Sequence, residues 1–346
     1  MESDVQVRQR ELPAPPPAAH PLKRAATRVL GGTFGPIVGV GGVLVALVLF
    51  ELLTEPTFGS ADNLTSLGRA AAVPLVVSAA MALVLLTGGV DLSIGSTLAL
   101  TGVLYAKLVT GGAPAGLALI ACLVFGAVVG FTVNGILIGR LDMSFFVVTI
   151  GTMSLYRGIV YLWTDSSTID MYGDRVSRAL GNDTILGGHV PIGLLVGLAL
   201  VLALWWVLRW TTFGRSIYAV GGNREATELA GVRAGWVTAA VYGVSGLCAA
   251  LAAVMTIGRS TIADPNMGLN LELTAAAAAL LGGVALSGGV GSVWGAVLGV
   301  AFLQALTNAL SLAGVSTSWQ LIVTGAILII AVYLDRVRAR AGVAGG

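Results

Sequence analysis

Lysine is nearly absent from this sequence: Lys23 and Lys107 are the only two in 346 residues. A phosphate-binding P-loop needs a lysine within a Gly-Lys-Ser/Thr run, because that lysine contacts the nucleotide phosphates. Here the two lysines follow Leu22 and Ala106. The chain is therefore not a P-loop ATPase.

Histidine and cysteine are just as rare. The two histidines are His20, in a proline-rich tail, and His189, between apolar runs, while Cys122 and Cys248 lie in separate apolar runs. This spacing matches neither a metal site nor a disulfide framework, so no cofactor is expected in this chain. No nucleophile and base occur at a suitable spacing, which argues against an enzyme.

Charged residues make up only 10% of the chain, whereas a soluble domain usually carries about 25%. Apolar types make up 56%, and the mean hydropathy is +0.91. One helical crossing of a bilayer takes roughly 20 mostly apolar residues, so this content suffices for about eight to eleven crossings. We predict an all-α, polytopic membrane protein with about ten transmembrane helices.

The polar residues divide the chain into three regions. Residues 1–30 are rich in proline and basic side chains and cannot bury a core, so a disordered cytoplasmic tail is expected. Residues 31–335 hold the apolar runs and form the transmembrane domain. Residues 336–346 form an arginine-containing carboxyl-terminal tail, which is also expected in the cytoplasm.

Charges and turn residues divide the apolar region into ten candidate spans. They are expected at 34–53, 70–87, 92–110, 114–139, 144–163, 190–208, 235–257, 273–287, 290–312 and 319–334. Only Gly-rich turns separate the second span from the third and the eighth from the ninth. Nine or eleven spans are therefore alternatives to ten.

The basic residues favour an even number of spans. With the amino terminus inside, ten spans place both tails, the segment near Arg140 and the loop 209–233 in the cytoplasm, where they hold most of the 19 basic residues. Such an excess of positive charge is typical of the cytoplasmic side. The loop 164–189 carries four aspartates against two arginines and is expected outside.

A short internal echo accompanies two of the junctions between spans. Gly-Gly-Val-Asp-Leu-Ser at 88–93 returns as Gly-Gly-Val-Ala-Leu-Ser at 282–287. Transporters are often built from duplicated units whose Gly-interrupted segments meet at the translocation path. A chain with 48 glycines also produces such a match by chance. An internal repeat and a coincidence therefore both stay open.

Asp91 requires an explanation, because an acid inside a bilayer costs about 2.5–3.5 kcal/mol on insertion scales. Either Asp91 caps a helix that starts at Leu92 by accepting hydrogen bonds from free backbone N–H groups, or it lines a polar solute path at a helix break. Other polar side chains inside apolar runs are candidates for the same path: Ser93, Asn134, Tyr156 and Arg157. Each also has a structural alternative, as a cap, an interhelical hydrogen bond, or an ion-paired or interfacial side chain.

The segment 213–231 lies in a predicted cytoplasmic loop. Asn223 is a favourable N-cap, Glu225 suits the positive end of a helix and Gly231 is a favourable stop, so a short helix is expected at 224–230. Such a helix between two spans is suited to docking another subunit, and a solvated connector is the alternative. The residues assigned to docking are Asn223, Arg224, Glu225, Glu228 and Gly231.

Three runs resemble the ribose/xylose-type sugar permeases of bacterial ABC importers, within the branched-chain amino acid/ribose permease superfamily. They are LTGGVDLSIGS at 86–96, TIGTMSLYRG at 149–158 and YAVGGNREA at 218–226. The resemblance covers roughly residues 70–333. The GGVDLS run resembles the sugar branch more than the related branched-chain amino acid permeases.

The resemblance implies a homodimer, embedded in lipid in the bacterial plasma (inner) membrane, with both termini of each chain in the cytoplasm. A separate ABC ATPase subunit, which binds ATP and Mg²⁺, drives transport, and an extracytoplasmic solute-binding protein delivers a ribose- or xylose-like monosaccharide. The helix at 224–230 matches the cytoplasmic coupling segment that fits a cleft on the ATPase. Nucleic acid is not an expected partner.

Alternative functions keep the same membrane fold. The same assembly can carry branched-chain amino acids, nucleosides or a signalling furanose. A stand-alone secondary transporter is less favoured, because such a transporter couples to ions through paired intramembrane acids and only Asp91 qualifies here.

Overall fold

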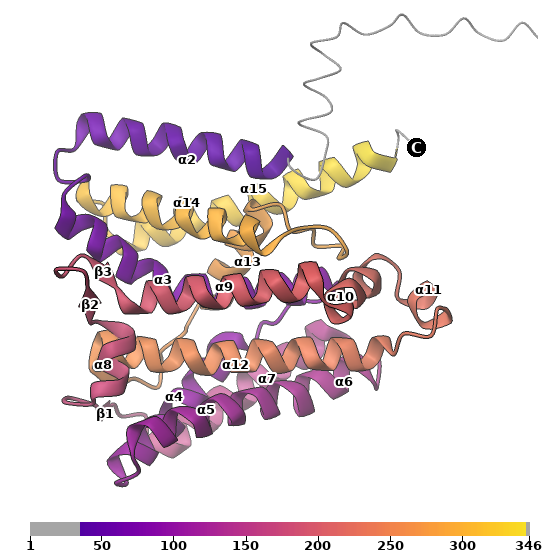
Figure 1. Ribbon diagram of the computed structural model, residues 1–346, viewed down its shortest axis with the longest axis horizontal. Coiled ribbons are helices and arrows are strands. Elements are labelled where there is room, and N and C mark those ends of the chain that lie inside the picture. Colours follow the sequence, from indigo (N-terminus) through magenta and orange to yellow (C-terminus); the bar gives the residue numbers. More distant parts are fainter. Residues whose placement is uncertain (1–34, 344–346) are drawn as a thin grey trace, which may run out of the picture.

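The computed structural model describes residues 35–343 and the side chains of residues 38–333. The predicted tail at 1–30 lies outside the described residues, as do the side chains of the predicted tail at 336–346. The described part is a bundle of helices with a few very short strands (Figure 1). The structure is therefore mostly helical, as predicted, with short strands that the sequence analysis did not predict.

The longer helices follow one another along the chain with few interruptions. They are α2 (Gly35–Thr54), α3 (Ala61–Leu86), α4 (Ile94–Thr110), α5 (Ala115–Val129), α7 (Phe145–Thr164), α9 (Ile192–Trp210), α12 (Ala234–Ser260), α13 (Leu271–Leu281), α14 (Val293–Leu312) and α15 (Thr317–Val343). Shorter helical segments are the π-helix η1 (Gly130–Gly135), α6 (Ile136–Gly139), α8 (Arg175–Gly181), α10 (Thr212–Gly222) and α11 (Arg224–Leu229). Strand β1 (Ile169–Asp170) pairs with β4 (Ile262–Ala263), and β2 (Thr184–Ile185) pairs with β3 (Val190–Pro191); both pairs are antiparallel.

Six of the described helices are long and apolar enough to cross a membrane: α3, the continuous α5–η1–α6 helix, α7, α9, α12 and α14. Shorter apolar stretches of 10–17 residues lie in α2, α4, α13 and α15. The predicted span at 273–287 is wrong in its second half, because α13 ends at Leu281 and residues 282–292 form turns. At 1.5 Å per residue, the 11 residues of α13 cover about 16 Å, roughly half of the hydrocarbon core.

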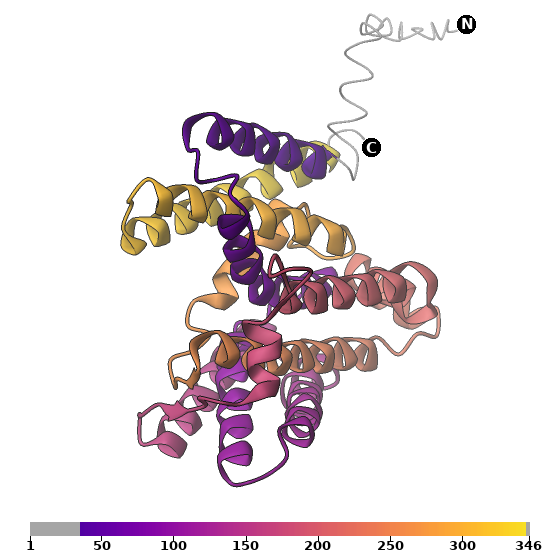
Figure 2. The same ribbon diagram turned by 60° about the vertical axis from the view of Figure 1, so that its left-hand side comes forward.

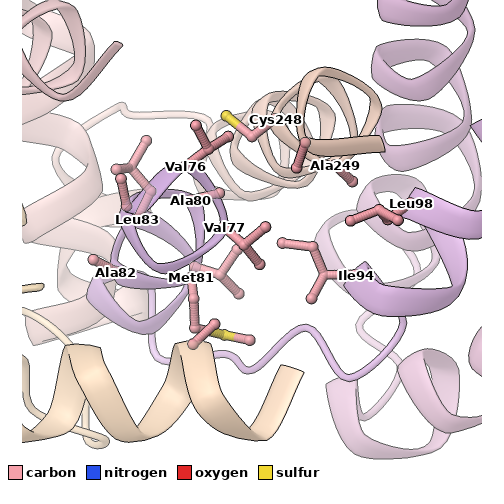
Figure 3. Packing of buried hydrophobic residues seen from close by; sticks show 14 of the residues in the cluster. Val76, Val77, Ala80, Met81, Ala82, Leu83, Ile94, Leu98, Cys248 and Ala249 are labelled. Atoms are coloured by element: carbon pink, nitrogen blue, oxygen red, sulfur yellow. The ribbon is translucent and has the colours of Figure 1, made fainter. Parts of the chain in front are cut away.

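Helices α3 and α12 form the centre of the bundle. In the apolar stretch of each, 72% of the residues are buried, against 22% for the α5–η1–α6 helix, which therefore has more of its surface on the outside of the bundle. α3 packs on α9, α13 and α14, α12 packs on α4, α5 and α8, and the two pack on each other. Figure 3 shows Val77 of α3 facing Ile94 of α4, and Val76 of α3 beside Cys248 of α12. Figure 2 shows α2 at the margin of the bundle, next to α14.

The α5–η1–α6 helix and α12 touch backbone to backbone. A β-carbon at Gly126 would collide with the carbonyl oxygen of Gly246, and one at Gly130 with that of Tyr242. Small residues allow such close approach in membranes, where van der Waals contact between helices replaces the hydrophobic effect. These glycines fix the position of η1 against α12.

The two glycine-rich turns, which follow α3 and α13, share one local structure. α3 and α13 each end in a C-cap residue that is followed by a left-handed glycine, Gly88 (φ 82) or Gly283 (φ 86). In both, the N–H after that glycine donates to the carbonyl five residues earlier, as in a Schellman motif. The structure therefore pairs Gly88 with Gly283, whereas the sequence echo pairs it with Gly282. An internal repeat stays a hypothesis.

The acidic segment 164–189 is folded onto the bundle through α8. Its N-cap residue, Asp174, accepts hydrogen bonds from the N–H groups of Val176 and Ser177 at 3.2 and 3.1 Å and from the Tyr105 hydroxyl at 2.6 Å. Burial by itself raises the pKa of Asp174, but the hydrogen bonds to its carboxylate outweigh burial and hold the pKa below its ordinary value. The charged carboxylate therefore stabilises this end of the molecule.

Asp174→Asn should abolish the loss of stability that protonation of the Asp174 carboxylate causes in the wild type at acid pH. The folded pKa lies below the unfolded value of about 3.9, so the stabilisation is present above that pH and is lost as the pH falls through the folded pKa. Asparagine keeps a capping oxygen, whereas Asp174→Ala should lose about 1 kcal/mol at neutral pH. Thermal unfolding of the three proteins between about pH 3 and pH 7 checks this; the same acid slope in wild type and Asp174→Asn contradicts it.

Candidate functional site

Asp91 lies at the break between α3 and α4 and has 3% of its surface exposed. One carboxylate oxygen accepts hydrogen bonds from the backbone N–H and the hydroxyl of Ser93, at 3.0 and 2.6 Å, and the other accepts one from the Ser245 hydroxyl of α12 at 2.7 Å. α4 begins at Ile94, so the carboxylate caps the turn before the helix, and the predicted start at Leu92 is two residues too early. Asp91 thus fixes the turn that precedes α4 rather than capping the helix itself, whose N-cap residue Ser93 has no side-chain capping hydrogen bond.

Asn134 joins the same network from η1. Its Nδ2 donates to the Ser93 hydroxyl oxygen at 2.7 Å, and its side chain is almost completely buried. The hydrogen bond links η1 to the residue before α4. The sequence analysis gave such an interhelical hydrogen bond as the alternative role of a polar residue in this set. Single turns of π-helix inside an α-helix are frequent at functional sites. Asn134 Oδ1 has no hydrogen-bond partner within the described chain.

Tyr156 brings a second buried polar group to this region. Its helix, α7, packs against both α4 and η1, and 4% of the residue is exposed. Its hydroxyl has no hydrogen-bond partner among residues 38–333. A tyrosine hydroxyl donates and accepts, and an amide oxygen accepts. Tyr156 and Asn134 therefore offer both kinds of polar partner in the interior.

Arg157, also on α7, holds the segment before α13 in place. Its Nη1 donates to the carbonyl oxygens of Pro265 and Met267 at 2.5 and 3.1 Å, and its Nη2 donates to that of Gly95 at 3.4 Å. Gly95 lies so close to this segment that a β-carbon there would collide with the carbonyl oxygen of Gly268. Backbone carbonyls thus surround the guanidinium, and no carboxylate of the described residues lies within 4 Å of it.

A cavity of about 380 Å³ lies beside the α3–α4 break. Gly88, Gly89 and Tyr242 line it on the side of the break, and Asp142 and Arg224 line it on the side of α11. The cavity therefore lies between the α3–α4 break and α11 (Arg224–Leu229), the helix that the sequence analysis assigns to docking.

The predicted loop before that element contains a helix, α10, which the sequence analysis did not predict. Its buried residues Gly214, Ile217 and Val220 recur every third residue and form one packed face. On another part of α10, the Tyr218 hydroxyl donates to the carbonyl oxygen of Gly291 at 3.0 Å. α10 is therefore a folded extension of the bundle rather than a solvated connector.

The end of α10 contacts the glycine-rich turns that follow α3 and α13. A β-carbon at Gly221 would collide with the carbonyl oxygen of Leu86, the last residue of α3, and would lie 2.5 Å from the nitrogen of Gly289. Gly289 in turn donates its N–H to that same Leu86 carbonyl at 3.0 Å. We call Gly88, Gly221, Gly288 and Gly289 the glycine junction. It places α10, α3 and the turn after α13 in direct backbone contact.

The short helix α11 confirms the expected local structure. It runs from Arg224 to Leu229, one residue shorter than predicted, with Asn223 accepting a hydrogen bond from the Ala226 N–H at 2.9 Å. Gly231 is left-handed, with φ 87, as expected for a stop. The sequence analysis overlooked Leu229, which is 85% exposed.

The charged residues of α11 divide into two groups. Glu225 and Glu228 are exposed. Arg224 turns toward the bundle, where its Nη2 donates to the Gly139 carbonyl oxygen at 2.6 Å and its other nitrogens lie 3.3 Å from Asp142 and 3.4 Å from Glu228. Arg224 therefore anchors α11, while Glu225, Glu228 and Leu229 form its free surface.

The sequence analysis missed three features of the candidate site: Ser245, Leu229 and the glycine junction. Ser245 is a small residue in an alanine-rich helix, 154 positions from Asp91, and no local pattern distinguishes it. Leu229 carried a usable signal, because it is a large apolar residue in a short polar helix. In the described part of the chain, no cluster of three or more His, Cys, Asp or Glu side chains is arranged to bind a metal ion.

Comparison with known proteins relates the chain to membrane permeases. The family described as "Branched-chain amino acid transport system / permease component" matches residues 63–332. The chain is 38% identical to the ribose import permease protein RbsC of Bacillus subtilis over 303 residues, or 87% of this chain and 92% of that protein. It is 34% identical to RbsC of Haemophilus influenzae over 84% of this chain and 90% of that protein. It is also 34% identical to the L-arabinose ABC transporter permease protein AraH of Azospirillum brasilense over 95% of both chains. No solved structure matches the chain.

Proposed function

This chain belongs to the family of permease components of branched-chain amino acid transport systems, and from that membership we propose that it is the membrane-spanning subunit of an ABC importer for a monosaccharide. The observation that carries the proposal is its 34–38% identity to ribose import permeases over 84–87% of its length. It is a multi-pass protein of the bacterial inner membrane and a transport component rather than an enzyme.

A sugar is favoured over the other solutes that this fold can carry. The family description names branched-chain amino acids, but the relatives that cover most of the chain are named for ribose, L-arabinose and galactose. A stand-alone secondary transporter is not favoured, because Asp91 is occupied on both oxygens by serine donors. The proposal is therefore a pentose or hexose delivered to an ATP-driven permease.

We propose ten membrane crossings with both termini in the cytoplasm, in which the eighth is made by the short helix α13 together with the irregular segment 282–292 that follows it. Ten apolar segments and the excess of basic residues on one side support this topology. The turns that follow α3 and α13 lie at the glycine junction, packed against α10. Irregular backbone is tolerated at membrane depth only where protein or a water-filled cavity surrounds it.

The solute path runs past the buried polar side chains near the α3–α4 break, which are Asp91, Ser93, Asn134 and Tyr156. Asn134 and Tyr156 contact the solute, because each carries a buried polar atom that no described residue satisfies. Asp91 and Ser93 hold the broken backbone at the edge of the path, and Arg157 holds the segment before α13 against α4. Discontinuous helices that border a substrate site are typical of transporters.

α11 is the segment that couples the path to ATP hydrolysis. Leu229 is the apolar centre of its free surface, Glu225 and Glu228 flank it, and Asn223 and Gly231 fix its two ends. A separate ABC ATPase subunit, which binds ATP and Mg²⁺, docks on this surface. The solute-binding protein docks at the opposite end of the bundle, near α8, and a second copy of the chain completes the path.

Force on α11 reaches the path through the glycine junction. α11 follows directly on α10, and α10 touches the end of α3 and the turn after α13. A shift of α10 therefore moves both helix breaks together. Such a transition requires two packings that differ by only a few kcal/mol.

Uptake by reconstituted vesicles tests the function. The full chain is reconstituted with the ATPase subunit and the solute-binding protein encoded beside it, and accumulation of radiolabelled ribose, arabinose and galactose is measured. We expect uptake of one of these sugars that requires ATP and the binding protein. Accumulation driven by an ion gradient with the chain alone would overturn the proposal.

Leu229→Asp with Glu225→Arg should release the ATPase without unfolding the permease. The change replaces the apolar centre of the α11 surface and reverses a flanking charge, so co-purification of the ATPase should fall at least about tenfold. Leu186→Asp is the matched control, because Leu186 is also highly exposed but lies in the acidic segment 164–189. Equal ATPase recovery with both variants would contradict the coupling role of α11.

A further inference from the structure

A basic pocket next to α11 contains two arginines, Arg140 and Arg233, that have no role in the proposed transport cycle. It has a volume of about 570 Å³ and lies between the end of α6 and the start of α12. Its charged and aromatic lining residues are Arg140, Asp142, Arg224, Glu228, Arg233 and Trp236. Figure 1 shows α6 and α11 at one end of the bundle and α8 at the other.

The positive charge of this pocket is only partly compensated. Arg224 pairs with Asp142 at 3.3 Å and with Glu228 at 3.4 Å, so one arginine occupies both acids of the pocket. Arg140 and Arg233 are exposed, and no carboxylate of the described chain lies within 4 Å of either. Two guanidinium groups therefore face one pocket without an anionic partner. A guanidinium group often donates two parallel hydrogen bonds to the oxygens of one phosphate.

Aromatic rings hold one of these arginines at the level of the membrane surface. The Arg140 guanidinium carbon lies 4.6 Å from the centre of the Trp236 ring, and that ring stacks on Phe131 at 5.8 Å. Trp236 is 38% exposed in the first turn of α12. Half-exposed tryptophan at the end of a membrane helix is typical of the interface where lipid headgroups lie.

An apolar stripe along α5 leads toward the pocket. Leu117, Ile120, Val124 and Val128 are 63%, 59%, 57% and 50% exposed, and their spacing of three or four residues places them on one face. The α5–η1–α6 helix that carries them continues through Phe131 to the edge of the pocket at Gly139. The stripe ends at Val128, 11 residues or about 16 Å before Gly139 along this helix, so an acyl chain that starts at the pocket runs over η1 and α6 to reach the stripe.

We propose that Arg140 and Arg233 bind the phosphate of an anionic phospholipid whose acyl chain lies on the α5 stripe. Basic pockets between membrane helices at the interface are known binding places for anionic headgroups. An acidic surface of the ATPase is the competing occupant, but it accounts for neither the stripe nor the exposed Trp236. The inference rests on the proposed membrane location and not on the solute carried.

Lipid titration by native mass spectrometry tests the proposal on the full chain in detergent. Phosphatidylglycerol and phosphatidylcholine with the same acyl chains are the probes, and inorganic phosphate is added as a competitor. We expect phosphatidylglycerol to bind more tightly, and Arg140→Gln with Arg233→Gln to weaken its binding about twenty-five-fold, at roughly fivefold for each arginine near an anionic headgroup.

Two further variants separate the pocket from general charge. Arg175→Gln with Arg259→Gln removes two exposed arginines at the opposite end of the bundle and should leave phosphatidylglycerol binding unchanged. Arg140→Lys with Arg233→Lys keeps the charge but loses the guanidinium contacts, so it should retain only part of the preference. Equal binding of the two lipids, an equal loss in the Arg175/Arg259 variant, or displacement by free phosphate at the same concentration would overturn the proposal.

The ATPase alternative has its own outcome. If the Arg140/Arg233 glutamine variant loses the ATPase in co-purification but keeps its lipid preference, the pocket belongs to the ATPase surface and the lipid proposal fails. Failure of sugar uptake in the reconstituted importer does not affect this result, because lipid binding is measured on the permease alone.

Discussion

Gly221→Ala is expected to reduce ATP-driven sugar uptake at least tenfold while the ATPase still binds. The added β-carbon meets backbone atoms of Leu86 and Gly289, which cannot rotate away as side chains can. α10 must therefore move away from the end of α3 and from the turn after α13. Overpacking of this kind also costs about 1–3 kcal/mol of stability. Motion of α11 would then no longer reach the two helix breaks.

Gly222→Ala is the matched control for this change. Gly222 is the next residue in α10, and a β-carbon there meets nothing within 4 Å. Both variants raise helix propensity by a similar amount, so a difference between them reports the glycine junction. Uptake, ATP hydrolysis and thermal unfolding are compared in the reconstituted importer. Equal behaviour of the two alanine variants would show that the junction transmits nothing.

Asp91→Ala should destabilise the protein by about 3 kcal/mol or more and abolish uptake. The substitution leaves the Ser93 N–H, the Ser93 hydroxyl and the Ser245 hydroxyl without their acceptor. A buried donor that loses its partner costs about 1–3 kcal/mol. The same change frees the turn that precedes α4, so the broken helix loses its fixed geometry.

Asp91→Asn separates the capping role from a role of the charge. The amide oxygen still accepts from Ser93, and the amide nitrogen donates to the Ser245 hydroxyl, which can also accept. We expect its thermal stability to lie within about 1 kcal/mol of the wild type and its uptake to recover well above that of Asp91→Ala. A folded Asp91→Asn protein without uptake would show that the carboxylate charge acts on the solute path.

The helical segments and α11 were predictable because their signals are local. Runs of apolar residues mark helices that lipid can surround, whatever their order in the bundle. Asn223 and Gly231 act within one helical turn of their own backbone, so the sequence was sufficient to place α11 to within one residue. The family was predictable for a related reason, because its motifs are contiguous runs.

Predictions failed where the decisive partner is distant in sequence. α10 was interpreted as loop, because two of the three residues on its packed face are glycine and valine and its partners include α12 and the end of α3, which are distant from it in sequence. The span at 273–287 was made too long, since Val284 and Leu286 are apolar even though the left-handed Gly283 ends the helix before them.

The sequence by itself determined that this chain consists mainly of apolar helices, lacks a P-loop and has a short capped helix at Arg224–Leu229, because composition and nearest neighbours decide those properties. Only the tertiary structure decided that Asp91 meets Ser245, that Arg224 faces inward and that Gly221 touches both helix breaks. Those contacts depend on backbones approaching closely across the bundle, and glycine permits such an approach without specifying which partner it meets.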